Sequence, residues 1–277
     1  MEQAEIDRYA PDRLLPPEAE FAEQYALDCA AGSDIAGRAS VAFVAICRNA
    51  MPWLVNTLAA VEETGKRFKS WSAFIFENDS DDGTKETLAA WHDGSQRVAE
   101  MVNNSRPHLY FTTATVRTIA LAEYRSRCQQ HVFNGPPVDF VVVFDCDPWA
   151  GWSIDGLMTS LEHFRTHPWA SMFASYSWAK WSEPNPYALH YDAFAARLNH
   201  WEQRDQQWFH WWHPAVGSPP VRFNSAFGQL AIYKRVPYLQ GVYTGEDCEH
   251  VTHARTMPGE VYLNPSQRCV SFWPPEG

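Results

Sequence analysis

The sequence predicts an α/β fold, in which a mostly parallel central sheet is flanked by helices. The main indication is the run of residues 138–144 (VDFVVVF), whose nearly continuous apolar and β-branched side chains are typical of a strand buried on both faces. A second such run, residues 40–46 (SVAFVAI), precedes a segment from Pro52 to Glu63 with the apolar spacing of a helix. Buried strands that alternate with helices form a sheet covered on both faces.

The composition is that of a globular protein. The 277 residues suffice for one large α/β domain or two small ones, and a hydrophobic fraction of 45% argues against a disordered chain. Lys and Arg number 22 against 33 Asp and Glu, which gives a formal net charge of -11. This excess of negative charge argues against nucleic acid or an anionic membrane as the main partner, and a bound phosphate would need a metal ion to supply positive charge.

The cysteines and the N-terminus predict a cytoplasmic protein. The six cysteines are scattered without a C-x-x-C pair, so neither a zinc knuckle nor a disulfide framework is indicated. The first residues are acidic and lack the apolar run of a signal peptide, and no stretch approaches the length needed to span a bilayer. Peripheral association with a membrane is left open.

The remaining elements follow from local patterns. Residues 1–38 are polar and Ala/Glu-rich, and we expect an N-terminal extension with one helix and no chemistry. Residues 39–277 are expected to form the domain. The predicted strands are residues 72–76, 108–112, 170–176, 229–233, 260–263 and 268–272, and the predicted helices are residues 85–91, 115–132, 154–164, 187–204 and 245–255.

Two carboxylates end the central buried strand. Asp145 and Asp147 lie where that strand would leave the sheet, at the carboxyl edge where open α/β folds bind their ligands. Being two residues apart, they can converge on one ion, and hard oxygen ligands that leave positions open suit Mg²⁺ or Mn²⁺ holding a diphosphate. The tripeptide alone is weak evidence, because Asp79 and Asp81 form a second D-x-D in the chain.

Two further segments carry charge near this edge. The loop of residues 77–84 (ENDSDDGT) holds four acidic groups, which would repel one another unless a ligand or the fold organises them, although it also reads as an ordinary capped turn. The helix before the central strand carries Arg117 and Arg125, eight residues apart, and Arg127. One of them could reach a pyrophosphate, but charged helix residues usually face water.

The second half of the chain offers aromatic, small and acidic candidates. Of the thirteen tryptophans, nine cluster between residues 149 and 212, mostly as expected core residues, while those near the site, such as Trp149, could stack on a sugar. Small residues at 225–228 would let a sugar approach the backbone. Residues 246–249 hold three carboxylates in four positions, more than helix capping needs. His250 and His253 share a helix face and could bind a metal, although unliganded helix histidines are commoner.

In order, these motifs resemble those of GT-A glycosyltransferases, over roughly residues 40–273. The stretch FENDSDDGT resembles the nucleoside-contacting loop of family 2 glycosyltransferases and of the fungal capsule-associated mannosyltransferases, and FDCD resembles their D-x-D metal motif. NSAFGQLAIYK is similar to the donor-sugar and acceptor turn, and GEDCEHVTHAR to the helix on which inverting members keep the catalytic base. RTIALAEYRSR and YDAFAAR are closer to the mannosyltransferase-like group.

The resemblance implies a single GT-A domain with a Rossmann-like sheet, divided into a nucleotide-sugar-binding half at 39–147 and an acceptor-binding half at 148–277. It implies transfer of a sugar from a UDP- or GDP-linked donor to a hydroxyl of a carbohydrate or glycolipid acceptor, as in polysaccharide synthesis, with Mn²⁺ or Mg²⁺. The implied donor-nucleotide residues are Arg48, Glu77, Asn78, Asp79, Arg125 and Asp145; the metal ligands are Asp147 and Asp145, with His250 or His253; the donor-sugar and acceptor residues are Trp149, Ser225, Phe227 and Gly228; and the catalytic residues are Asp247 as base and Glu246 beside it.

Three points stay open at this stage. Residues 268–272 lack the histidine that many metal-dependent members have near the last strand, so the third metal ligand and the choice between inversion and retention are undecided. A sugar-phosphate nucleotidyltransferase is an alternative, disfavoured because residues 47–51 have no glycine. The other alternative is an inactive carbohydrate-binding protein, which the retained carboxylates disfavour.

Overall fold

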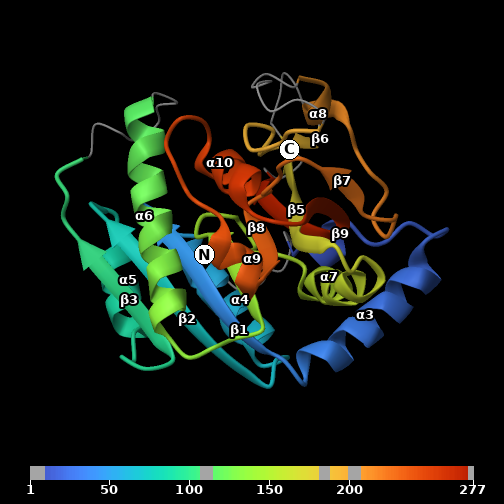
Figure 1. Cartoon of the computed structure of the whole chain (residues 1–277), viewed down its shortest axis with the longest axis horizontal. Coiled ribbons are helices and arrows are strands. Elements are labelled where there is room, and N and C mark those ends of the chain that lie inside the picture. Colours follow the sequence, from blue (N-terminus) through green and yellow to red (C-terminus); the bar gives the residue numbers. More distant parts are fainter. Residues whose placement is uncertain (1–9, 107–114, 181–187, 199–206, 274–277) are drawn as a thin grey trace.

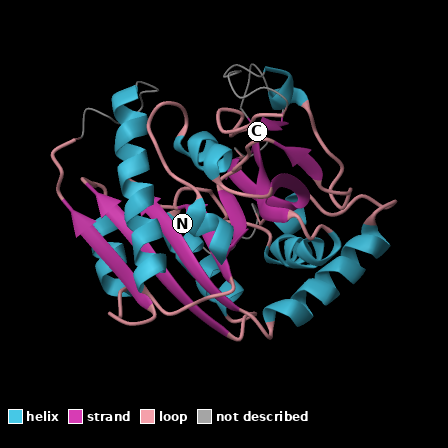
Figure 2. Cartoon of the chain, in the orientation of Figure 1, coloured by secondary structure: helices cyan, strands magenta, loops and turns pink. Residues whose placement is uncertain are grey.

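The computed structural model describes residues 10–106, 115–180, 188–198 and 207–273. Within these ranges one sheet of nine strands runs through the molecule in the order β3-β2-β1-β4-β8-β5-β9-β7, with β6 paired to β5. Helices cover both faces of the sheet (Figures 1 and 2). The α/β prediction is therefore confirmed.

The first half of the chain builds the parallel part of the sheet. Its strands β1, β2, β3 and β4 pair in parallel, as buried strands linked by helical crossovers do. All of them therefore end at the same edge of the sheet. The elements are β1 (Ser40–Cys47), α4 (Leu54–Gly65), β2 (Ser70–Asn78), α5 (Thr84–Trp91), β3 (Arg97–Val102), α6 (Thr115–Asn134) and β4 (Phe140–Asp145).

The second half extends the sheet with mixed pairing. Strand β8 lies between β4 and β5 and is antiparallel to both, and β9 is parallel to β5. Strand β7 pairs antiparallel with β9, and β6 pairs antiparallel with β5. The elements are α7 (Ile154–Thr166), β5 (Ala170–Lys180), β6 (Ala188–His190), α8 (Gln207–Trp211), β7 (Val221–Phe223), β8 (Leu230–Lys234), α9 (Arg235–Gln240), α10 (Glu249–Thr256) and β9 (Glu260–Phe272).

Two hydrophobic clusters pack on opposite faces of the sheet. Because side chains alternate along a strand, Val44 of β1 points into the cluster under α6, α9 and α10, whereas Phe43 points into the cluster under α4, α5 and α7. The central strand β4 is buried on both sides: residues 141–144 are each 0% exposed. This double burial explains why its sequence is continuously apolar.

The N-terminal segment packs on the body of the domain. Helix α3 (Ala22–Ala36) runs alongside α7 (Figure 1), and the short helix α2 (Pro11–Leu14) reaches β9. Arg268 of β9 is fully buried and donates to the Asp12 carboxylate at 2.6 Å, the Tyr25 hydroxyl at 2.9 Å and the Leu15 carbonyl. A buried guanidinium thus depends on acceptors from this segment.

Some local predictions were wrong or lie outside the described residues. Strand β3 was not predicted, and the strand expected at 108–112 lies outside the described residues. The helix expected at 187–204 is wrong over 188–198, which form β6 and a series of turns, and its remainder is not described. The last two predicted strands are one strand, β9, whose pairing with β5 shifts register at Ser175. Helix α10 begins at Glu249, four residues later than expected.

Adding one methyl group to α3 tests how closely α3 packs against α7. A Cβ at Gly32 would clash with the backbone carbonyl of Met158, whereas a Cβ at Gly37 would meet the backbone oxygen of Ser33 at an ordinary 3.6 Å. Gly32→Ala should lower the free energy of unfolding by about 1–3 kcal/mol through overpacking. Gly37→Ala, at a φ of -60°, should raise it by about 0.4–1 kcal/mol. Equal urea midpoints for the two variants would contradict the close packing.

Candidate functional site

A cavity of about 350 Å³ opens at the carboxyl ends of β1, β2 and β4. This is the edge at which the sequence predicted a ligand site, because parallel strands leave the sheet there. Its wall also includes residues from the second half of the chain, around 191–194, 227–229 and 248–250. The predicted site residues found in the wall are Arg48, Asn78, Arg125, Asp145, Asp147, Phe227 and His250.

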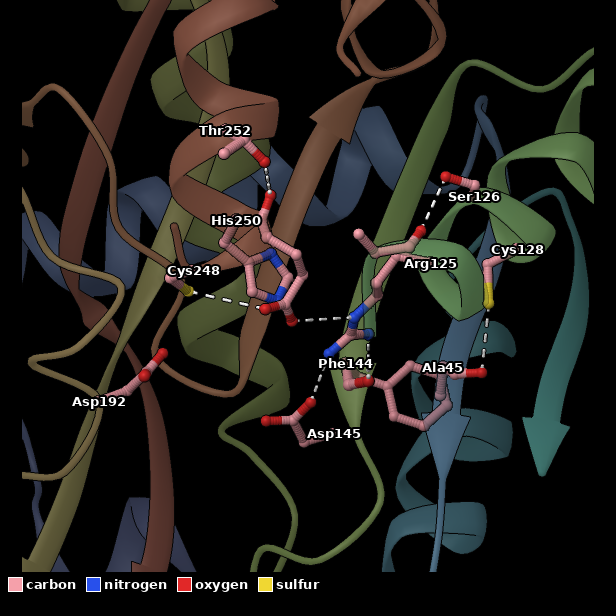
Figure 3. Close-up of polar contacts among 12 residues, drawn as sticks. Ala45, Arg125, Ser126, Cys128, Phe144, Asp145, Asp192, Cys248, His250 and Thr252 are labelled. Atoms are coloured by element: carbon pink, nitrogen blue, oxygen red, sulfur yellow. Dashed lines mark hydrogen bonds and ion pairs between the residues drawn. The ribbon is translucent and has the colours of Figure 1, made fainter. Parts of the chain in front are cut away.

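Arg125 is the buried cation of this site. It lies on α6 and is 2% exposed. Its Nη2 donates to Asp145 Oδ1 at 2.7 Å, and its Nε lies 3.8 Å from Glu249 Oε1 (Figure 3). Burial raises the pKa of Glu249, while the nearby guanidinium opposes that rise by stabilising the carboxylate. The sequence alone did not decide whether Arg125 faces solvent or a pyrophosphate. The structure places it in the cavity wall between two carboxylates.

The two carboxylates of the D-x-D have different surroundings. Asp145 is paired with Arg125, and its backbone N–H donates to the carbonyl of Gln229 at 2.9 Å. Asp147 is exposed to the cavity, and Gln229 Nε2 lies 3.4 Å from its Oδ1. Gln229 follows Gly228, and both have positive φ values, 63° and 64°. A non-glycine residue in this region is strained, and such strain often marks a functional turn.

The carboxylates of the acidic loop after β2 accept hydrogen bonds from backbone N–H groups of the loop itself and of two neighbouring loops. Glu77 is fully buried, and its Oε1 accepts from the N–H of Ser80 at 2.8 Å. Asp79 accepts from the N–H of Ser105 at 3.0 Å, and Asp82 from that of Met51 at 3.0 Å. These bonds are those of a capped loop, and only Asn78 of the loop lines the cavity. A nucleobase contact by Glu77 or Asp79 stays a prediction.

Three more arginines add positive charge to the cavity wall. Arg48 follows β1, Arg106 follows β3, and Arg117 lies one turn into α6. Arg48 Nη1 donates to the carbonyl of Arg106 at 3.2 Å, and Arg106 pairs with Glu123 at 2.7 Å. Arg106 was not predicted from the sequence, because nothing local distinguishes it from other surface arginines.

Asp247 and Glu246, the predicted catalytic residues, lie outside the cavity wall. Asp247 Oδ1 accepts from Arg197 Nη2 at 3.1 Å and from the N–H of Cys248 at 2.8 Å. Arg197 is fully buried and also donates to the carbonyls of Phe194 and Ala196. Glu246 is exposed. Catalytic roles for both residues stay predictions, and the contacts of Asp247 are those of a buried ion pair.

The two histidines of α10 have different positions. His250 lines the cavity, stacks on Phe227 with ring centroids 3.6 Å apart, and has no hydrogen-bond partner among the described residues at either ring nitrogen. Burial, followed by the charge of Arg125, lowers its pKa well below the usual range. His253 points away from the cavity, and its Nε2–H donates to the carbonyl of Tyr238 at 3.0 Å. His253 is thus less suited than His250 to reach a ligand.

Three predicted sugar-site residues, Trp149, Ser225 and Gly228, contact neighbouring parts of the protein and do not line the cavity. Trp149 stacks on Trp53 with centroids 4.5 Å apart. Ser225 is fully buried and donates to the carbonyl of Ala195 at 2.8 Å. The N–H of Gly228 donates to Asp192 Oδ2 at 2.9 Å, and a Cβ at this position would clash with the carbonyl of Ser175. Direct sugar contacts by these residues stay predictions.

Besides Arg106, the wall residues Tyr191, Asp192, Gln229 and Glu249 were not predicted as site residues from the sequence. Asp192 and Tyr191 belong to the stretch YDAFAAR, which had been noted only as a resemblance. Glu249 was one of three acidic residues ahead of α10 and was not singled out. Gln229 sits in the turn expected to face the sugar. The sequence signal that could have identified these residues is that their motifs place polar side chains at turns, where side chains are not needed for the core.

Asp145 and Asp147 are compatible with a cation whose other ligands come from water and a bound phosphate. Among the described residues no three His, Cys, Asp or Glu side chains come together as a complete metal site. Asp147 offers an exposed carboxylate and Asp145 lies two residues away with Oδ1 on Arg125. Mg²⁺ sites often use one or two carboxylates and take their other ligands from water and phosphates, so this pair is compatible with such an ion.

Comparisons with known proteins bear on the fold. No protein-family model and no curated protein matches the chain. The mannosyltransferase PcManGT from Pyrobaculum calidifontis, solved with GDP-Man and Mn²⁺, aligns over 91% of this chain and 66% of that protein, with 13% identity and a TM-score of 0.50. TarS 1-349 from S. aureus, solved with UDP-GlcNAc, aligns over 86% and 59%, with 9% identity and a TM-score of 0.48.

The first of these likenesses shows the fold, and this chain has a GT-A fold with a Rossmann-like sheet. The chain spans 66% and 59% of the lengths of the two proteins. No helix in the described part of the chain is long and apolar enough to cross a membrane.

The buried pairing of Arg125 predicts a large effect of its removal. Arg125→Met would leave two carboxylates in the cavity wall without their cation, and we expect the free energy of unfolding to fall by about 3–5 kcal/mol. Arg127→Met, two residues along α6, removes an exposed pair with Glu100 and should change it by less than about 1 kcal/mol. Urea unfolding measures both variants; a similar small effect for the two would contradict the buried ion pair.

Burial of His253 predicts a pH dependence of stability. Burial lowers its pKa to about 4, from an ordinary value of 6.5. Between these values the unfolded chain binds a proton that the folded protein does not, so this residue's contribution to stability is present above pH 6.5 and is lost as the pH falls toward 4. In His253→Gln, which can still donate to Tyr238, the decrease between pH 7 and pH 5 should be smaller by about 2 kcal/mol. Parallel pH profiles for the variant and the wild type would contradict this.

Proposed function

We propose that this protein transfers a sugar from a nucleoside diphosphate sugar to an acceptor hydroxyl, with a divalent cation at Asp147. The observation that carries the proposal is the polarised cavity at the carboxyl ends of β1, β2 and β4. Arginines line its nucleoside side, and the D-x-D carboxylates stand at its floor. A diphosphate needs positive charge around its oxygens, and this arrangement supplies part of it.

The metal would complete the charge. When bound, a divalent cation stabilises the departing diphosphate as a Lewis acid. Asp147, exposed to the cavity, would hold it, and Asp145 would contribute or contact the ribose. Gln229, next to Asp147, would fix the orientation of that carboxylate through its amide. The fold likeness to a mannosyltransferase solved with GDP-Man and Mn²⁺ supports a nucleotide-sugar donor and a divalent cation.

The nucleoside would lie against Asn78 and Arg48, at the ends of β2 and β1. The bonds that fix residues 79–82 to the loop after β1 hold this part of the wall in place before a ligand binds. Preorganisation of this kind lowers the entropy cost of binding. The acceptor would be a carbohydrate or a glycolipid, entering from the side of residues 191–194.

Thermal unfolding in the presence of nucleotides tests the donor site. We expect GDP or UDP with Mn²⁺ to raise Tm, because a ligand that binds only the folded state stabilises it. At 100 times Kd the gain is about 2.7 kcal/mol, or about 5–10 °C for a chain of this size. Asp147→Asn should lose the Mn²⁺-dependent part of the shift.

The matched control is Asp155→Asn, the same chemical change at an exposed position of α7 outside the cavity. It should keep the full shift. The donor assignment fails if no nucleoside diphosphate or nucleotide sugar raises Tm with Mn²⁺, and the metal assignment fails if Asp147→Asn responds as the wild type does.

A further inference from the structure

The carboxylate of Asp192 is held in the cavity wall by backbone contacts. Its Oδ2 accepts from the N–H of Gly228 at 2.9 Å, and its own N–H donates to the Ser177 hydroxyl at 3.3 Å. Gly228 has a φ of 64°, and any Cβ there would clash with Ser175, so glycine is required for this turn. Figure 3 shows Asp192 across from Arg125 and Asp145, reaching toward the same space. Asp192 is therefore held through its backbone by β5 and through its carboxylate by the turn that precedes β8.

Asp192 has no cation partner among the described residues, in contrast to Asp145 and Glu249. Asp145 and Glu249 both face Arg125, and Asp247 is paired with Arg197 outside the wall. In the described ranges no Lys or Arg pairs with Asp192, and one of its oxygens is occupied by a backbone N–H. The other oxygen is left to face the cavity. An ion pair would weaken a carboxylate as a base, and Asp192 is the wall carboxylate outside the D-x-D without one.

We propose that Asp192 is the general base that activates the acceptor hydroxyl, and that the acceptor is a pyranose sugar bound beside it. This inference rests on the proposed function, since a base is needed only where a hydroxyl attacks. It assigns to Asp247 the structural role of holding Arg197, and through Arg197 the segment 194–197 that follows Asp192.

The surroundings of Asp192 suit this role. Burial in the wall, and after it the negative charge of Asp145, raises the pKa of Asp192 to about 8. A carboxylate with a raised pKa is a stronger base than one in water, and general bases are most effective when their pKa is near the working pH. The N–H of Gly228 keeps the carboxylate oriented while the proton moves.

The aromatic rings beside Asp192 point to a sugar acceptor. Tyr191 is 45% exposed and lines the cavity together with Phe194 and Phe227. Tyr191 packs edge-on against Phe272, and Phe227 stacks on His250. The contact with Phe272 fixes the ring of Tyr191, whose exposed face can pack on the apolar face of a pyranose while its hydroxyls reach Asp192. Phe227, 3% exposed and lying beside the Arg125 guanidinium, supports the wall behind this position.

The step is balanced without a further reactant. The acceptor oxygen forms a bond to the anomeric carbon of the donor as the bond from that carbon to the diphosphate oxygen breaks. The leaving diphosphate takes the electron pair, and the hydroxyl proton passes to Asp192. The proton is released to water when the product leaves.

Asp192→Asn tests the assignment, because its amide oxygen can still accept from Gly228 while it cannot take a proton. The assay is release of nucleoside diphosphate from GDP-mannose, UDP-glucose or UDP-N-acetylglucosamine, whichever the wild type turns over, with water and with p-nitrophenyl pyranosides as acceptors. We expect kcat to fall at least about 100-fold, with the Kd for the nucleoside diphosphate and Mn²⁺ changed less than about threefold. Asp34→Asn, on the exposed face of α3, is the matched control and should retain full turnover.

The outcomes of these assays decide the assignment of the base. A kcat within about threefold of the wild type for Asp192→Asn overturns the proposal, and so does a loss of nucleotide binding in that variant. If Asp192→Asn does not fold, Asp192→Glu replaces it; retained turnover with a shifted pH profile supports the base role, and an unchanged profile overturns it. Loss of kcat in folded Asp247→Asn, with normal Asp192→Asn, assigns the base to Asp247 instead. A wild type that binds no nucleotide overturns the proposed function itself, a result distinct from these.

Discussion

The buried guanidinium of Arg125 is the interaction on which the site depends. Burying a charge is costly unless oppositely charged groups and hydrogen bonds surround it. Here Asp145 of β4 and Glu249 of α10 provide the charge, and Nη1 also lies 3.4 Å from the carbonyl of Phe144. One side chain of α6 therefore joins the end of the central strand to the helix that closes the cavity. It also leaves Asp147, rather than Asp145, as the carboxylate most available to a metal ion.

A strained turn links the two ends of the cavity. Gly228 fixes Asp192 through its N–H, and the next residue, Gln229, contacts Asp147 and accepts through its side-chain oxygen from Ser271. The proposed metal carboxylate and the proposed base are thus oriented by adjacent residues of one turn. Two successive residues with positive φ are unfavourable for all but glycine, so the surrounding strands must hold this turn in place. A shift at either ligand would be transmitted to the other through a single peptide unit.

The features that the sequence predicted correctly are those determined locally. The buried strands β1, β2 and β4 and the helices α6 and α7 follow from side-chain periodicity, which depends only on near neighbours. The segment 188–198 was predicted to be part of a helix, and its alanines do favour one. In the structure Arg197 is buried against Asp247, and its N–H donates to the carbonyl of Ser225. Contacts from distant parts of the chain override local propensity there. The cavity roles of Asp192 and Glu249 depend on such contacts, and no local pattern reveals them.

The charges around the cavity account for the chemistry proposed for it. Its wall holds four arginines and four carboxylates, so its formal charges balance before any ligand enters. These charges are unevenly distributed around the cavity. Arg48, Arg106 and Arg117 lie on the side proposed to bind the nucleoside, whereas Asp192 lies on the side proposed to bind the acceptor. A nucleoside diphosphate adds negative charge that the arginines, already facing carboxylates, cannot neutralise alone, and a divalent cation at Asp147 would restore the balance. The same separation keeps Asp192 away from Arg48, Arg106 and Arg117, and leaves Arg125 as the wall arginine whose charge lowers its pKa. One end of the cavity is thereby suited to stabilise a leaving group and the other to accept a proton.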